Sequence, residues 1–223
     1  MDEVEKKWRT FLLEGKDIPY QIYCDMDGVL VDLEAGLEEE LAFADIEDDA
    51  KEQAFQVVNS GILWQTLQQD PEFSKGAGAV FDILSKRPAG QREAFWANLP
   101  PKKDMKDLWN YISVYNPIIL SAPWTVDGVI DEACVRGKER WIRNSLSSQP
   151  KEIIITPDKK AHAAFNHILI DDMDKYLGPW RETIRVALKV GDLDPEEADK
   201  FAIEHVSAAN TIEELKKMAG FDN

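Results

Sequence analysis

The chain has 223 residues, of which 42 are acidic and 26 are basic, so its formal net charge is −16. A surface this acidic repels phosphate backbones, and we do not expect the protein to bind duplex nucleic acid. The hydrophobic content of 44% is ordinary for a folded protein and excludes general disorder. No apolar run approaches the roughly 20 residues that cross a bilayer, and the charged N-terminus differs from a signal peptide. These features lead us to expect a cytoplasmic protein without a membrane partner. The two cysteines form no C-x-x-C pair, which fits a reducing compartment.

Four short apolar runs, each followed by polar residues, predict buried strands of a parallel sheet. They are Ile18–Cys24, Pro117–Leu120, Ile153–Thr156 and His167–Ile170. Helices are predicted between the later runs, a long one over Val126–Leu146 with Thr125 or Asp127 as its N-cap and a short one over Asp158–Ala164. Strands that alternate with helices indicate an α/β protein with a Rossmann-like, doubly wound sheet flanked by helices.

The segment 33–101 contains no clear strand and predicts a small, mostly helical insertion directly after the first strand. Its expected helices are Leu33–Asp49, Asp49–Gly61, Phe73–Ser85 and Arg92–Leu99. The chain is therefore expected to form an α/β core domain from residues 1–32 and 102–223, with residues 33–101 as a second, inserted domain.

The strongest local signal is Asp25-Met26-Asp27-Gly28 at the end of the first predicted strand. Ligands of open parallel sheets bind beyond the carboxyl ends of the strands. Side chains at i and i+2 of an extended segment share a face, so Asp25 and Asp27 can approach one bound group. A calcium loop and a solvated turn are the alternatives; the glycine spacing and the absence of a glutamate at position twelve disfavour the calcium loop.

The segment DMDGVLVD resembles the first motif of the haloacid dehalogenase superfamily. Later stretches match the remaining motifs in order: Ser121 after an apolar run, a lysine at Lys159 or Lys160, and the pair Asp171-Asp172. The sequence LIDD, and F-W-x-N-L-P at 95–100, are similar to the 5′(3′)-deoxyribonucleotidase branch. The tail resembles phage-type members, with a last strand over Phe201–His205 and a closing helix over Ser207–Lys217. Residues 181–200 depart from that pattern and are expected to form an extra helix pair or an oligomer contact.

This resemblance implies an Mg²⁺-dependent phosphatase in which Asp25 is the nucleophile and forms an aspartyl-phosphate. It implies that Asp27 acts as general acid and then general base, which requires a raised pKa. Mg²⁺ would be held by Asp25, the backbone carbonyl of Asp27 and Asp171, with Asp172 as a further anchor.

The resemblance also assigns groups that would contact the substrate. Ser121 would donate to a phosphoryl oxygen, with Ala122 beside it, and Lys159 or Lys160 would neutralise charge. Lys159 is preferred because it follows Asp158, although both lysines could instead lie on a solvated helix N-terminus. In the insertion, Phe43, Trp64 and Trp96 are candidates for stacking on a base; the alternative is that they form the insertion's own core.

The expected activity is hydrolysis of nucleoside monophosphates, with deoxyribonucleotides favoured. A phosphatase of another small ester, such as a sugar phosphate, and a catalytically idle binding protein of the same fold remain as alternatives. A polynucleotide end-phosphatase is disfavoured by the acidic composition. The sequence does not decide whether the protein forms a homodimer.

Overall fold

A computed structural model describes residues 20–59, 74–164, 166–181, 186–189 and 208–216. The chain forms two compact units. The first lies within Met1–Leu30, Lys102–Ala122 and Ser147–Asn223; the second lies within Val31–Pro101 and Pro123–Leu146. The second unit thus contains the insertion expected at 33–101 and also Pro123–Leu146, which the sequence assigned to the core. The division into a core domain and an inserted domain stays a prediction.

The first unit is built on a five-stranded sheet in the order β5-β2-β1-β6-β7. Its strands are β1 (Gln21–Cys24), β2 (Ile118–Ser121), β5 (Glu152–Ile155), β6 (His167–Asp171) and β7 (Val186–Lys189). All neighbouring pairs are parallel, which confirms the expected α/β class. Cys24 lies opposite Ile119 of β2 and Ile170 of β6. The carboxyl ends of the three central strands therefore meet at one edge.

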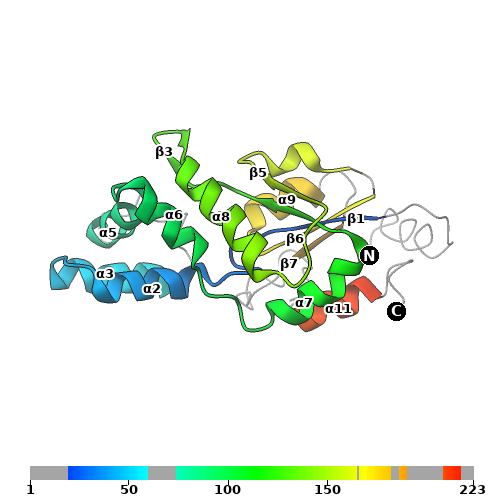
Figure 1. Cartoon of the computed structure of the whole chain (residues 1–223), viewed down its shortest axis with the longest axis horizontal. Helices are drawn as coiled ribbons and strands as arrows, with labels where there is room; N and C mark the ends of the chain where they lie inside the picture. Colours follow the sequence, from blue (N-terminus) through cyan, green and yellow to red (C-terminus); the bar gives the residue numbers. More distant parts are fainter. Residues whose placement is uncertain (1–19, 60–73, 165, 182–185, 190–207, 217–223) are drawn as a thin grey trace. The chain divides into compact units, whose positions relative to one another are not determined.

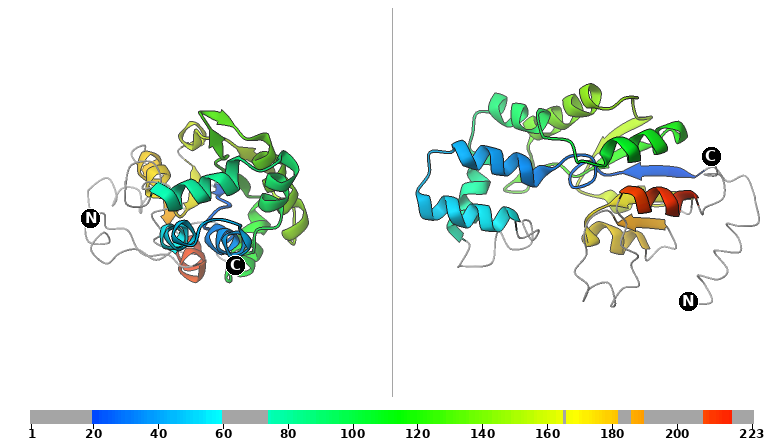
Figure 2. Two further views of the ribbon diagram at one scale, coloured as in Figure 1. Left: turned by 90° about the vertical axis from the view of Figure 1, so that its left-hand side faces the viewer. Right: turned by 90° about the horizontal axis from the view of Figure 1, so that it is seen from below.

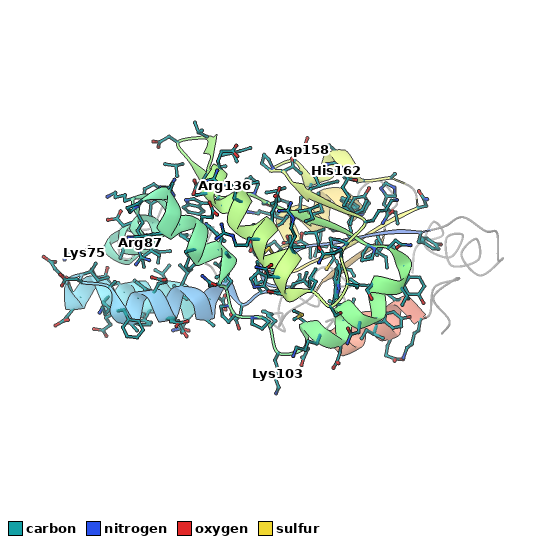
Figure 3. All side chains as sticks on the ribbon, viewed as in Figure 1. Lys75, Arg87, Lys103, Arg136, Asp158 and His162 are labelled. Atoms are coloured by element: carbon teal, nitrogen blue, oxygen red, sulfur yellow. The ribbon has the colours of Figure 1, made fainter. Side chains whose placement is uncertain are left out.

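Helices cover both faces of this sheet (Figure 1). They are α7 (Met105–Ile112), continued by a 3₁₀ turn over Ser113–Tyr115, α9 (Asp174–Arg181) and α11 (Ala208–Lys216). Helices α7 and α11 pack side by side, and α9 packs against β6 and β7. The short helix expected at Asp158–Ala164 is a single 3₁₀ turn, Lys159–His162. Asp158 Oδ1 caps it by accepting from Ala161 N at 3.2 Å, and Asp158 and His162 mark its two ends in Figure 3.

The second unit is mostly helical, as the sequence predicts. It contains α2 (Leu33–Phe43), α3 (Asp48–Asn59), α5 (Ser74–Ser85), α6 (Ala89–Ala97) and α8 (Glu132–Ser145), shown from two further directions in Figure 2. Helices α6 and α8 approach closely at Gly137, where a Cβ would lie 2.5 Å from Trp96 Cβ and 2.6 Å from the Glu93 carbonyl oxygen. Within the described part of the chain, no helix has the length and apolar character needed to cross a membrane.

The predicted start of the long helix at Val126 is wrong. Thr125–Val126 (β3) and Val129–Ile130 (β4) pair as an antiparallel hairpin. Asp127 and Gly128 form its turn with φ values of 50° and 77°. Asp-Gly is the preferred two-residue loop for such a turn, because both central positions need positive φ. Helix α8 begins only after Asp131, whose side chain accepts from Ala133 N.

The C-terminal part differs from expectation in one respect. The stretch 181–200, expected as a helix pair or an oligomer contact, contains strand β7, which pairs in parallel with β6. Its run of three apolar residues, Val186–Leu188, is too short a signal for a strand among the charged residues around it. The closing helix expected at Ser207–Lys217 is α11, whereas the strand expected at Phe201–His205 lies outside the described residues.

Candidate active site

Three carboxylates gather at the carboxyl edge of the sheet. Asp25 follows β1, Asp171 ends β6, and the two lie beside each other because Cys24 pairs with Ile170 and Asp25 N donates to Ile170 O at 2.9 Å. Asp172 is the next residue. One oxygen from each of the three carboxylates lies within 4.8 Å of the others. Asp25 and Asp171 are almost fully buried, at 4% and 0% exposure.

The ammonium group of Lys159 joins two of these carboxylates. Its Nζ lies 2.8 Å from Asp25 Oδ2 and 2.7 Å from Asp171 Oδ2, and the lysine is buried. The 3₁₀ turn that begins at Lys159 directs this side chain into the cluster, while the next residue, Lys160, is exposed. Of the two candidate lysines, the structure therefore brings Lys159 to the acidic cluster.

The second oxygens of the two aspartates are held by backbone donors. Met26 N donates to Asp25 Oδ1 at 2.7 Å, and Met173 N donates to Asp171 Oδ1 at 2.8 Å. Each carboxylate thus receives one N–H from the turn that follows its own strand and one from Lys159. These bonds fix the orientation of both groups before any ligand arrives, which is the condition for effective electrostatic catalysis.

Burial and the closeness of the charged groups shift the pKa values within the cluster. Burial and the charge of Asp25 raise the pKa of Asp171 to about 7, although Lys159 opposes this shift. Burial, with the charges of Asp171 and Asp25, raises the pKa of Asp172 well above its usual range. Burial alone would lower the pKa of Lys159, but the two carboxylates outweigh burial and raise it. Three ionised carboxylates and the ammonium of Lys159 together give the cluster a net charge of −2.

The residues present suit a hard divalent cation. All of the ligand atoms that the cluster offers are carboxylate oxygens, the type that Mg²⁺ and Ca²⁺ prefer. A divalent charge would balance the net charge of the cluster, and it would offset both the burial and the mutual repulsion that raise the carboxyl pKa values. Asp25, Asp171 and Asp172 are the residues that would hold it.

Only glycine fits at position 28, because the Asp172 carboxylate lies against it. Its φ is 72°, in the region that favours glycine, and a Cβ there would lie 1.9 Å from Asp172 Oδ2. The motif glycine therefore both turns the chain after β1 and leaves room for the third carboxylate. Spacing alone predicted the turn but not this close approach.

The remaining residues of the motifs lie at the same edge. Asp27 is half-buried in the turn after β1. Ser121 is buried at the end of β2, where its backbone oxygen accepts from Thr156 N at 2.9 Å, and Ala122 beside it is half-buried. Since the register places the ends of β1 and β2 together, Ser121 belongs to the edge that carries the carboxylates.

The aromatic candidates of the second unit have different surroundings. Trp96 is buried at 1% exposure, and its ring contacts Phe95 at a centroid distance of 5.2 Å and Lys138 Nζ at 5.0 Å. Phe43, at the end of α2, is 85% exposed. Trp64 lies outside the described residues. Trp96 is thus part of the packing of its own unit, whereas Phe43 is exposed and its proposed role in stacking stays a prediction.

Tyr176 and Lys175, at the start of α9, are site residues that the sequence analysis missed. Lys159 Nζ lies over the Tyr176 ring, 4.3 Å from its centroid, and Lys175 Nζ lies 4.7 Å from the same centroid. Burial and the neighbouring Lys159 charge lower the pKa of Lys175. The available signal was their position in the first turn of the helix after Asp171-Asp172, since residues there face the strand end that precedes them.

Comparison with known proteins shows likeness at the level of structure. No protein-family profile matches the sequence, and no curated protein matches it. An L-2-haloacid dehalogenase has a TM-score of 0.52 at 13% identity over 88% of this chain and 99% of that chain. A second dehalogenase has a TM-score of 0.52 at 12% identity over 90% of this chain and 98% of that chain. A predicted phosphatase from Clostridium acetobutylicum has a TM-score of 0.51 at 12% identity over 89% and 97%. The chain therefore has the α/β fold of haloacid dehalogenases and of this phosphatase.

Proposed function

We propose that the chain is a hydrolase of the haloacid dehalogenase superfamily that removes phosphate from nucleoside monophosphates with the help of Mg²⁺. The observation that carries the proposal is the cluster of the buried Asp25 and Asp171 with the half-buried Asp172, in which Lys159 bridges the first two. Such a cluster offers a nucleophile, a cation site and a fixed ammonium at one strand edge. Phosphate monoesters are dianions, and a carboxylate can attack them only where positive charge offsets the repulsion.

The same cluster disfavours the dehalogenase reaction named by two of the structural neighbours. A 2-haloacid carries its own carboxylate and would have to approach three further carboxylates. Attack on a carbon–halogen bond expels a halide, and it does not call for an oxygen-ligated divalent cation. The acidic cluster is costly for that chemistry, whereas it is useful for holding a cation that meets a phosphate.

In the proposed reaction, an Asp25 oxygen attacks phosphorus and the ester P–O bond breaks. Asp27 gives its proton to the departing alkoxide, so the alcohol leaves neutral. Asp27 then takes a proton from water, the water oxygen attacks phosphorus, and the bond from Asp25 to phosphorus breaks to release inorganic phosphate. Lys159 and the Ser121 hydroxyl donate to the phosphoryl oxygens. A bound Mg²⁺ would supply positive charge to these oxygens throughout.

Nucleotides are proposed as the substrate class because of the sequence, which carries the LIDD and F-W-x-N-L-P patterns that resemble deoxyribonucleotidases.

The test is phosphate release from a panel of deoxyribo- and ribonucleoside monophosphates, sugar phosphates and p-nitrophenyl phosphate, each with Mg²⁺ and with a chelator. Asp25→Asn is the matched control, because an amide and a carboxylate have nearly the same volume. We expect Mg²⁺-dependent turnover that prefers nucleotides and disappears in Asp25→Asn. Halide release from 2-chloropropionate without phosphate release would contradict the proposal, and equal rates on sugar phosphates would contradict its nucleotide part.

A further inference from the structure

The buried ammonium of Lys159 contacts two kinds of group, namely carboxylates and an aromatic ring. It carries three N–H groups, and two carboxylates lie within 2.8 Å. On another side, the ammonium lies over the face of the Tyr176 ring at 4.3 Å from the centroid. A desolvated ammonium over an aromatic face is attracted by the ring's negative quadrupole, and the attraction is strongest where water is excluded.

We propose that Tyr176 is a positioning residue, whose ring face holds the Lys159 ammonium where it can meet the phosphoryl group. The inference rests on the proposed function, because it assigns a role within that same site. Tyr176 would act through Lys159 and would not touch the substrate.

An aromatic face suits this position beside Lys159 better than a carboxylate or another oxygen acceptor would, because the cluster is already negatively charged. A further carboxylate beside Lys159 would add negative charge to a cluster that already has three carboxylates for one ammonium. A hydroxyl or carbonyl oxygen would accept an N–H strongly and would compete with the substrate for it. A ring face attracts the cation with little demand on direction. The ammonium can therefore turn one N–H toward an arriving phosphoryl oxygen without leaving its place.

The same ring also accommodates a second cation. Lys175, on the exposed side of α9, places its Nζ 4.7 Å from the Tyr176 centroid. Two like charges near one ring would repel each other, and the ring's quadrupole offsets part of this repulsion. Any effect of changing Tyr176 must therefore be separated from an effect on Lys175.

The experiment varies the charge distribution of the ring at nearly constant shape. Position 176 is replaced by phenylalanine, 4-fluorophenylalanine, 3,5-difluorophenylalanine and pentafluorophenylalanine, and kcat and KM are measured on the best nucleotide. Because fluorine withdraws electron density from the ring face, we expect kcat to fall stepwise along the series, by about tenfold to thirtyfold in total. Tyr176→Phe retains the face and should stay close to wild type, and Tyr176→Leu should resemble the pentafluoro variant.

Two controls isolate the contact with Lys159. Tyr111 makes the corresponding contact with Lys216, at 6.0 Å, so Tyr111→Leu removes a tyrosine ring from a lysine elsewhere in the same unit and should leave kcat unchanged. Repeating the series in a Lys175→Met background should give the same slope, because the effect runs through Lys159. Melting temperatures confirm that each variant is folded.

An active wild-type protein with a flat fluorine series would overturn this inference alone. A slope that disappears in the Lys175→Met background would also overturn it, since the ring would then act through Lys175. A wild-type protein inactive on every phosphate ester would overturn the proposed function, and this inference with it.

Discussion

At the scale of single residues, the site is defined by how closely a few atoms approach. Gly28 shows this most clearly, because an added methyl group would overlap Asp172 Oδ2 at 1.9 Å. Gly28→Ala should therefore displace the third carboxylate and weaken the apparent affinity for Mg²⁺ by about tenfold to a hundredfold. Titration of activity, or of melting temperature, with Mg²⁺ measures this affinity.

The control for Gly28 is Gly128, which has a similar φ of 77° and no atom within 4 Å of its virtual Cβ. Gly128→Ala should cost about 1 kcal/mol of stability from backbone strain and leave Mg²⁺ affinity unchanged. An equal loss of Mg²⁺ affinity in both variants would show that strain, and not the contact with Asp172, is responsible.

Asp27 allows a second test at this scale. If it protonates the leaving group, Asp27→Asn should slow alkyl phosphates far more than aryl phosphates, because a phenoxide leaves without much protonation. The ratio of kcat/KM for a nucleotide to that for p-nitrophenyl phosphate should fall by about tenfold or more. Parallel losses on both substrates would instead assign Asp27 a structural or cation-binding role.

At this scale, the sequence predicts the residues of the motifs but not the residues that contact them. Asp25, Asp171 and Ser121 were predictable because parallel strands bring their carboxyl ends to one edge. Lys159 was separable from Lys160 only through the 3₁₀ turn that buries one and exposes the other. The position of Tyr176 after Asp171-Asp172 indicates only that it lies near the strand end, because the contact of its ring with Lys159 depends on the angle of α9.

At the scale of secondary-structure elements, the contact between α6 and α8 depends on a residue without a side chain. Ala is a better helix former than Gly by about 1 kcal/mol, yet a Cβ at Gly137 would meet Trp96 Cβ and the Glu93 carbonyl oxygen. Both atoms are fixed by the backbone, so Gly137→Ala should lower stability by about 1–3 kcal/mol. Gly78→Ala in α5, where none of the described residues lies within 4 Å of an added Cβ, should raise stability. Urea melts of the pair should shift in opposite directions.

The start of α8 provides a pH-dependent contact. Asp131 accepts from Arg92 Nε at 3.0 Å and from Arg92 Nη2 at 2.9 Å, and it also caps the helix. Burial alone would raise the pKa of Asp131, but the pairing with Arg92 outweighs burial and lowers it. A lowered pKa means that the stabilisation is complete above about pH 4, the unfolded value, and is lost as the pH falls through the folded value.

Asp131→Asn isolates this charge, because asparagine can still cap the helix. The substitution should cost about 1–3 kcal/mol at pH 7 and much less near pH 2. Urea unfolding of both proteins across this range measures the difference, and a difference that does not change with pH would exclude the ion pair as its source.

The errors in predicted elements have a common cause. The sequence predicts the first turn of a helix at Thr125–Ile130, because the Val and Ile residues there also fit a helical spacing. The Asp127-Gly128 pair favours a two-residue hairpin turn instead, and the structure contains this turn. Trp96 and Phe43 are both aromatic residues of the helical unit, yet one is buried and the other exposed, because burial depends on which helices pair. Composition does not specify that pairing.

For the whole molecule, the charge of −16 opposes the approach of any anionic substrate. Raising the ionic strength from about 10 mM to about 150 mM shortens the screening length from about 30 Å to about 8 Å. At fixed Mg²⁺, kcat/KM for a dianionic ester should therefore rise severalfold while kcat stays constant. A fall in kcat/KM would show that the local field of Lys159 and Lys175 controls the approach instead.

The order of the strands has a consequence for a chain emerging from the ribosome. Strand β1 is made first among the described strands. Its neighbours in the sheet, β2 and β6, are translated about a hundred residues or more later, so β1 cannot pair with them until then. The helical unit is complete in the sequence at Leu146, before β5, β6 and β7 are made. Domains generally fold as units during synthesis, so the helical unit can fold while β1 still lacks β6, one of its two neighbours in the sheet. The nascent chain should therefore depend on chaperones most strongly between the translation of β1 and that of β6, and Asp25 acquires Lys159 and Asp171 as partners only at the end of that interval.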